Sequence, residues 1–268
     1  MAEEVIHRKL ERTAMGFVLA IIAAASVGGI VEIAPLFTID NTVENVADLR
    51  VYTPLELMGR DIYVREGCYA CHSQMIRTLA DEVDRYGPYS LAVESKYDHP
   101  MLWGSKRTGP DLARVGGKYS DQWHAEHLNN PREVVPESNM PAYPWLAKTE
   151  LDLATVADRL RTQSRLGVPY TEEMIQNAAA DVQAQVNPDS PNVSALVERY
   201  GDKTQVSAFD GVTTRLTEAD AVIAYLQVLG QMTNAAFENT AAPEQAPGPE
   251  DLGPDAGGTT ESSNAAKP

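Results

Sequence analysis

The 268-residue sequence predicts a mainly α-helical protein with one N-terminal transmembrane helix and a helical domain that carries long loop insertions. Three observations predict this class. An uncharged apolar segment lies near the N-terminus, and later segments repeat apolar residues at helical spacing. No stretch alternates apolar and polar residues for long enough to require a sheet. A chain of this length can bury a core without disulfide bonds.

Composition excludes two classes of protein. The chain has 22 basic and 38 acidic residues and a net charge of −16, whereas binding to nucleic acid needs clustered Lys and Arg. With two cysteines, the chain cannot be a disulfide-rich secreted domain. We therefore expect no nucleic-acid partner and a core built from apolar side chains.

Residues 13–37 form the predicted membrane anchor. Their first part, TAMGFVLAIIAAASVGGIV, carries no charge, and about twenty apolar residues span a bilayer. A cleaved signal peptide is the alternative, because Ala23–Ala25 resembles a cleavage region. The apolar character continues past Glu32 to Phe37, which favours an uncleaved helix.

The flanking charges predict the orientation of this anchor. Arg8, Lys9 and Arg12 precede it, and flanks rich in Lys and Arg stay on the cytoplasmic side. Residues 1–12 are therefore predicted to be cytoplasmic. Glu32 lies at the outer end of the span, where it is either an interfacial residue or a functional one.

Two later segments have the strongest helical patterns. Pro54 suits the first turn of a helix over residues 54–66, whose apolar residues lie on adjoining faces. A second helix is predicted over residues 217–229, with Thr217 as its N-cap and Gly230 as its stop signal. Weaker helical patterns cover residues 120–128 and 149–162.

Both cysteines lie in one motif, Cys68-Tyr69-Ala70-Cys71-His72. C-x-x-C-H is the attachment sequence of a c-type haem: the two thiols reach the two vinyl groups of one porphyrin, and the adjacent histidine ligates the iron. A redox dithiol does not need the histidine, and a zinc site needs two further ligands at matching spacing. The motif therefore predicts one covalently bound haem c, with Cys68 and Cys71 as attachment residues and His72 as an iron ligand. Since haem c is attached outside the cytoplasm, the predicted cytochrome c-like domain, residues 38–235, is expected to be periplasmic.

The second face of the haem needs a methionine, a histidine or an open position. Met140 is the predicted ligand, because it lies in a proline-containing loop rather than on an amphipathic stripe, and His/Met ligation is typical of cytochromes c. Met101 is the other methionine candidate. His99, His124 and His127 would each give bis-histidine ligation.

Three further residues are predicted to contact the haem. A metal-bound histidine normally donates its second ring N–H to a fixed acceptor. In cytochrome c-like domains the proline carbonyl of a G-P-x-L turn accepts it, which makes Pro110 the candidate here. Tyr143 and Trp145 follow Met140 and are predicted to wall the ring. Basic residues that either pair with the haem propionates or are simply solvated are Lys106, Arg107 and Arg114.

The C-terminal residues 236–268 differ in composition from the rest of the chain. They are acidic and rich in Pro and Gly. Such a segment cannot bury a core, so it is predicted to be a disordered tail. Part of the negative charge therefore belongs to this tail rather than to a binding surface.

Four separated signatures together resemble one known family. They are the anchored segment ending in Val-Glu-Ile-Ala-Pro-Leu-Phe, the Gly-Cys-Tyr-Ala-Cys-His site, the stretch from His99 to Leu112, and Asn139-Met140-Pro141. In this order they resemble the mono-haem cytochrome c subunit (subunit II) of cbb3-type cytochrome c oxidases, over roughly residues 5–235.

The resemblance implies a fold and a role. The fold is that of cytochrome c, with Gly59 and Tyr63 of the first helix packed against Tyr225 of the last, and with His72 and Met140 as axial ligands. In that family the subunit lies in the bacterial inner membrane, in contact with lipid, beside a di-haem cytochrome c subunit and a catalytic subunit with haem b, haem b3 and copper. It relays electrons from the donor c-type haems, or from a soluble cytochrome c, to haem b. The proton-pumping complex reduces oxygen to water, and this chain is not an enzyme on its own.

Two alternatives stay open. The mono-haem subunit of a nitric oxide reductase has similar elements, but the long excursion over residues 74–106 fits the oxidase better. A haem peroxidase or a haem gas sensor would need an open or exchangeable axial site.

The segment 165–212 is a second, more polar insertion without a mechanistic interpretation. The resemblance implies that residues 103–107 face the catalytic subunit. A structural calcium ion near Ser105 is conceivable there, although nothing in the sequence requires it.

Overall fold

The computed structural model describes residues 8, 12–39, 43–44, 46 and 48–236. Within these residues the chain is mainly α-helical, and its β-structure is limited to an isolated antiparallel bridge between Glu150 and Thr217. The predicted fold class is therefore confirmed. The predicted tail from residue 237 onward, and most of the predicted cytoplasmic segment 1–12, lie outside the described residues.

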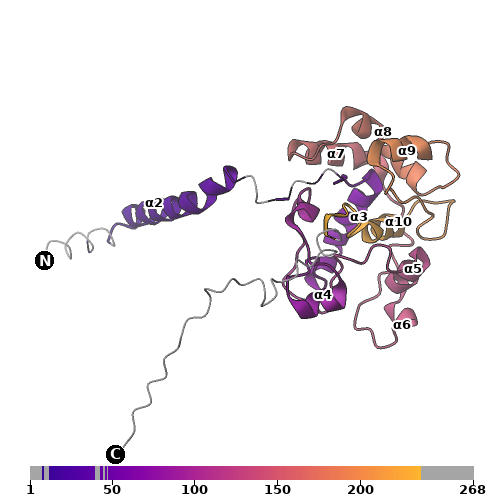
Figure 1. Cartoon of the computed structure of the whole chain (residues 1–268), viewed down its shortest axis with the longest axis horizontal. Coiled ribbons are helices and arrows are strands. Elements are labelled where there is room, and N and C mark those ends of the chain that lie inside the picture. Colours follow the sequence, from indigo (N-terminus) through magenta and orange to yellow (C-terminus); the bar gives the residue numbers. More distant parts are fainter. Residues whose placement is uncertain (1–7, 9–11, 40–42, 45, 47, 237–268) are drawn as a thin grey trace, which may run out of the picture.

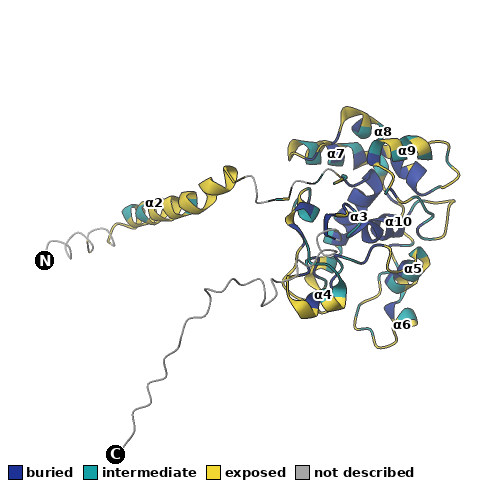
Figure 2. Ribbon diagram, in the orientation of Figure 1, coloured by how far each residue is buried: buried dark blue, intermediate teal, exposed yellow. Residues whose placement is uncertain are grey.

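Helix α2, Ala14–Ile33, continues into the short 3-10 helix η1, Ala34–Phe37. Within the described chain, this is the helix long and apolar enough to cross a membrane, with a mean hydropathy of 2.3 and none of that window buried by protein. Figure 1 shows α2 standing apart from the helical domain, and Figure 2 shows most of its surface exposed. An apolar helix that no other part of the described protein covers fits a membrane anchor.

Two helices form the centre of the domain, α3 (Pro54–Arg65) and α10 (Glu218–Val228). Gly59 permits their close crossing, because a Cβ at this position would lie 1.8 Å from the carbonyl oxygen of Ala221. The rings of Tyr63 and Tyr225 then meet, with centroids 5.3 Å apart. Figure 2 shows both helices as deeply buried. The packing implied by the family resemblance is thus observed.

Both central helices begin at a capping box, which fixes where each helix starts. The Thr53 backbone N–H donates to the Glu56 carboxylate at 2.8 Å, while the Glu56 N–H donates to the Thr53 hydroxyl at 3.2 Å. Thr217 and Asp220 repeat this arrangement at the start of α10. Gly230, with φ of +79°, follows the end of α10. The helices predicted around residues 54–66 and 217–229 are confirmed.

The other helices of the described domain surround this pair: α4 (Ala80–Tyr86), α5 (Asp121–Asn129), α6 (Pro131–Val134), α7 (Val156–Arg165), α8 (Glu172–Gln185) and α9 (Val193–Tyr200). Short 3-10 helices are η3 (Cys68–Ala70), η4 (Ala92–Ser95) and η5 (Leu153–Thr155). Helix α5, capped by Ser120, confirms the pattern predicted there. Helix α5 packs against α10 and α8 packs against α3.

The helix predicted over residues 149–162 is wrong at its start, because regular α-helix begins only at Val156. Leu151 donates its backbone N–H to the Leu216 carbonyl at 3.1 Å. This bond holds the segment beside the chain that leads into α10. A tertiary contact therefore replaces the first turn that the local pattern predicts.

The second insertion, residues 165–212, contains helices rather than one long loop. It is tied to the start of α3 by the buried side chain of Gln185. The hydroxyl of Thr53 donates to Gln185 Oε1 at 2.6 Å, and Gln185 Nε2 donates to the Gln205 carbonyl at 3.0 Å. Helix α8 of this insertion thus packs against α3.

The first insertion, residues 74–106, is anchored to α3 by a buried ion pair. Arg60 is 1% exposed and donates its Nε to Asp98 Oδ1 at 3.0 Å. Its other nitrogens donate to the carbonyls of His99 and Pro100. Because an unpaired buried guanidinium is very unfavourable, these bonds hold the insertion against α3.

Candidate functional site

The Cys-x-x-Cys-His motif lies directly after α3. Gly67 has φ of +74°, a left-handed conformation that glycine adopts without strain, and it turns the chain into η3. His72 donates its backbone N–H to the Cys68 carbonyl at 3.0 Å. The turn therefore presents both thiols and the histidine next to the central helix pair.

The two thiols are not joined in a disulfide; Cys68 is half-buried and Cys71 is exposed. Burial raises the pKa of the Cys68 thiol to about 11, whereas a redox-active dithiol needs a thiol of lowered pKa. Among the residues that the structure describes, no three His, Cys, Asp or Glu side chains are grouped to hold a metal ion. The redox-dithiol and zinc interpretations thus gain no support.

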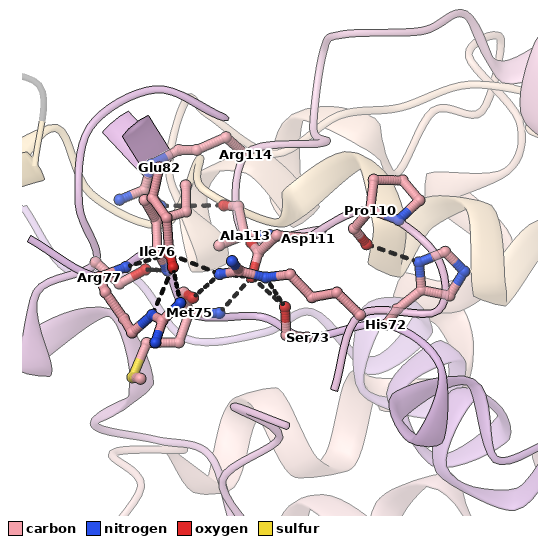
Figure 3. A network of polar contacts seen from close by, with 12 residues as sticks. His72, Ser73, Met75, Ile76, Arg77, Glu82, Pro110, Asp111, Ala113 and Arg114 are labelled. Carbon is pink, nitrogen blue, oxygen red and sulfur yellow. Dashed lines mark hydrogen bonds and ion pairs between the residues drawn. The ribbon is translucent and has the colours of Figure 1, made fainter. Parts of the chain in front are cut away.

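The imidazole of His72 is oriented by the carbonyl of Pro110. Its Nδ1 lies 2.8 Å from the Pro110 oxygen (Figure 3). Because a carbonyl only accepts hydrogen bonds, Nδ1 carries the proton and donates it, which leaves the lone pair of Nε2 free for a metal. The structure therefore places Pro110 in the position that the sequence predicted.

Backbone hydrogen bonds flank this contact on both sides. Gly109 donates its N–H to the Cys71 carbonyl at 2.9 Å. Leu112 donates its N–H to the Ser73 carbonyl at 2.8 Å. Gly109 also lies flat against the ring, because a Cβ there would be 2.3 Å from His72 Cε1. Only glycine allows the two loops to approach this closely.

The substitution Gly109→Ala is expected to lower the stability of the domain. The added methyl group must displace either the His72 ring or the backbone, and such overpacking typically costs about 1–3 kcal/mol. The free energy of unfolding from a denaturant titration measures the effect. Ser105→Ala, at an exposed position of the adjacent loop, is the control and is expected to change stability by less than about 0.5 kcal/mol. Equal stabilities for the two variants would contradict the close packing.

A cavity of about 490 Å³ lies against the motif, within the range of roughly 300–1,000 Å³ that is usual for small-molecule and cofactor sites. Both cysteines, His72 and Pro110 line it. Apolar walls come from α3, α5 and α10, through Tyr63, Leu128, Val222 and Leu226. A mostly apolar cavity that presents two thiols and an imidazole has the donor set and the surface that fit a covalently bound porphyrin.

Met140 is the methionine that the described structure brings into this cavity. Its side chain is half-buried and packs against the main hydrophobic core, and its backbone N–H donates to Ser138 Oγ at 3.2 Å. Met101, the other methionine candidate, is 52% exposed and lies outside the cavity lining. His72 and Met140, 68 positions apart in the sequence, therefore share one cavity.

Two of the three alternative histidines also line the cavity, whereas His99 does not. His127 stacks on Trp123, with ring centroids 4.6 Å apart, and His124 meets the same indole edge-on at 5.4 Å. Both imidazoles are thus packed against an aromatic ring of their own helix. Met140, His124 and His127 therefore share the cavity with His72.

Burial lowers the pKa of His124 to about 4, so its side chain is neutral at pH 7. Within the described residues, His124 Nε2 and His127 Nδ1 are buried without a hydrogen-bond partner. Buried polar atoms are nearly always paired in folded proteins. Unpaired nitrogens in the wall of the cavity are expected where a bound cofactor would supply the missing polar partners.

The chain matches a family model over residues 7–233, and the family is described as the cytochrome c oxidase mono-haem subunit, FixO. The chain belongs to this family. The match confirms the resemblance to the mono-haem subunit of cbb3-type oxidases that the motifs indicated. None of the curated proteins searched matches the chain. Family membership indicates one haem and a role in electron transport for this oxidase subunit.

The two predicted aromatic residues have different positions in the oxidase subunit. Tyr143 lines the cavity, whereas Trp145 does not. Trp145 is 45% exposed, its indole N–H donates to Glu66 at 3.2 Å, and its ring meets that of Tyr143 at 5.3 Å. Trp145 therefore supports Tyr143 from outside the cavity.

Of the three basic residues considered for the haem propionates, Arg114 lines the cavity, whereas Lys106 and Arg107 do not. Arg107 donates to Glu82 at 2.8 Å, and Arg114 donates to Glu94 at 2.8 Å. Lys106 is exposed and lies outside the cavity lining. Both guanidinium groups therefore pair with carboxylates of the protein, and the choice between haem propionates and solvent that the sequence left open stays untested.

Sequence reasoning missed an aromatic stack on the cavity wall. Tyr119 stacks on Trp123 at 4.0 Å, and Trp123 stacks on His127. All three residues line the cavity. Trp123 and His127 are four residues apart on α5, which places them on one face of the helix, whereas Tyr119 precedes the helix; the helical spacing of Trp123 and His127 is the signal that could have revealed part of the stack.

Proposed function

We propose that this subunit carries one haem c, joined by thioether bonds to Cys68 and Cys71, with His72 and Met140 as the axial ligands of the iron. The observation that carries the proposal is the shared cavity, which both thiols, the imidazole and the methionine thioether line. Tyr143 borders the same space. When bound, the haem would supply a one-electron redox centre.

The residues around the cavity have separate tasks in this proposal. The Pro110 carbonyl holds the proton on Nδ1 of His72 and makes Nε2 a better donor to a metal. A methionine on the other face favours a high reduction potential. The apolar walls keep water away from the site, and exclusion of water also raises the potential.

We further propose that the subunit relays electrons in a cbb3-type oxidase. The donors would be the c-type haems of a di-haem subunit or a soluble cytochrome c, and the acceptor would be haem b of the catalytic subunit with haem b3 and copper. The proton-pumping complex would reduce oxygen to water, and this chain would not be an enzyme on its own. Membership of the oxidase mono-haem family supports this role.

In this proposal Ala14–Phe37 spans the bacterial inner membrane once, in contact with lipid. Residues 1–12 would lie in the cytoplasm and the haem domain in the periplasm. The apolar helix and the basic residues Arg8, Lys9 and Arg12 before it support this orientation. The requirement that haem c be attached outside the cytoplasm agrees with it.

The two alternative functions are less well supported. A nitric oxide reductase subunit is not favoured by the match to the oxidase family. A peroxidase or gas sensor needs an open axial position, whereas Met140 lies in the same cavity as His72.

The test is isolation of the native complex. An affinity-tagged chain is purified from membranes of its own organism in mild detergent, and haem c, haem b and copper are quantified. We expect all three, together with oxygen consumption. Consumption of nitric oxide without consumption of oxygen would support the reductase instead, and isolation as a lone chain without haem b would overturn the relay.

A further inference from the structure

The buried carboxylate of Asp111 lies next to the His72–Pro110 contact and has no role in the proposed function. Asp111 directly follows Pro110, and its side chain is 0% exposed. Its Oδ2 accepts a hydrogen bond from the hydroxyl of Ser73 at 2.6 Å and another from the backbone N–H of Met75 at 3.0 Å (Figure 3). Asp111 therefore joins the loop after His72 to the loop that contains Pro110.

A guanidinium group completes this connection. Arg107 Nε donates to the hydroxyl of Ser73 at 2.7 Å, and its Nη2 lies 3.3 Å from Asp111 Oδ2. The same Nη2 donates to Glu82 Oε2 at 2.8 Å. Arg107 thus has a carboxylate on each side, and the Ser73 hydroxyl accepts from it while donating to Asp111.

Helix α4 of the first insertion supplies Glu82. This carboxylate is 3% exposed and also accepts from Nε and the backbone N–H of Arg77. Hydrogen bonds from Arg107 and then Arg77 hold the pKa of Glu82 well below its usual range. Glu82 therefore stays ionised at neutral pH and keeps Arg107 in place, which gives the first insertion a physical role near the site.

We propose that Asp111 is a positioning residue that sets the His72–Pro110 hydrogen bond and, through it, the reduction potential of the haem. This inference rests on the proposed function. Ser73 adjoins His72 and Asp111 adjoins Pro110, so their short hydrogen bond limits how far the two loops can separate. A stronger hydrogen bond at Nδ1 makes the imidazole a more basic ligand and favours oxidised iron.

The negative charge of Asp111 is expected to lower the reduction potential of the haem, as its hydrogen bonds do. A buried carboxylate near the iron stabilises the oxidised form, which carries one more positive charge. The Arg107 guanidinium offsets this effect only in part, because it is shared with Glu82. Loss of the carboxylate is therefore expected to favour reduced haem through both routes.

The experiment compares the reduction potential of haem c in the purified full complex with and without Asp111→Asn. At a fixed ambient potential we expect the ratio of reduced to oxidised haem c to rise about tenfold, which is 59 mV for a one-electron couple. The g values of oxidised haem c in electron paramagnetic resonance are expected to change too, since they report the orientation of the imidazole plane. Ser73→Ala removes the connecting hydroxyl without changing charge, and it is expected to raise the ratio about threefold, as for the loss of one hydrogen bond.

Asp181→Asn is the matched control, because Asp181 is also buried and paired with an arginine, Arg199, but lies in the second insertion. We expect it to leave both the potential and the g values of haem c unchanged. An unchanged potential in Asp111→Asn and Ser73→Ala, or an equal shift in Asp181→Asn, would overturn the inference. Absence of a covalent haem with histidine and methionine ligands from the wild-type complex would instead refute the proposed function.

Discussion

Replacement of both Cys68 and Cys71 by serine is expected to abolish covalent attachment of haem. Serine cannot form the thioether bonds, although His72 and the apolar walls of the cavity remain. Haem could then bind only reversibly and would leave the chain on denaturation. Haem staining of denaturing gels and extraction with acidified acetone measure the loss, which is expected to be complete.

The single variants Cys68→Ser and Cys71→Ser provide the controls for this experiment. Each keeps one thiol, so each is expected to retain some covalent haem through a single thioether bond. Haem that resists extraction from the double variant would show that these cysteines are not the attachment residues. It would also remove the main support for a c-type site.

Replacement of Met140 by leucine is expected to remove the methionine–iron charge-transfer band from the spectrum of the oxidised protein. Leucine has a similar volume but no sulfur, so the cavity wall is kept while the ligand is lost. The reduction potential is expected to fall by on the order of 0.1 V, since axial ligands set haem potentials over roughly 0.8 V. Optical spectroscopy and a potentiometric titration measure the two effects.

Met101→Leu is the matched control, because Met101 is exposed and lies outside the cavity lining. Its spectrum is expected to equal that of the wild type. An unchanged band in Met140→Leu would refute the assignment, and His124→Leu and His127→Leu would then test the two histidines that line the same cavity.

The local features of the site could be predicted from the sequence because their chemistry depends on neighbouring residues. The spacing of Cys68, Cys71 and His72 is a property of one turn of chain, and the capping residue Thr217 acts within its own helix. The contact from Pro110 to His72 was also predicted, because the resemblance to cytochrome c-like domains indicated it, and the structure contains it.

Other features depended on partners that the local sequence pattern does not reveal. The helix expected from residue 149 begins later, because Leu151 bonds to the chain before α10. For Arg107 the sequence left a haem propionate and solvent as alternatives, and the structure pairs it with Glu82 and Asp111. Trp145 as a wall of the haem ring stays a prediction; its indole N–H donates to Glu66, and Trp145 is not part of the cavity lining. In each case a contact made in the folded structure, rather than the local pattern, fixed the position of the helix or side chain.

By itself, the sequence determined the helical class, the apolar segment near the N-terminus, the Cys-x-x-Cys-His motif and the family. These features depend on residue type and short spacing, which folding does not change. Only the tertiary structure decided that Met140 and His72 share a cavity and that Asp111 connects the two loops beside the histidine. Such juxtapositions depend on how α3 and α10 cross and on where the insertions pack, and these are collective results of burying one core.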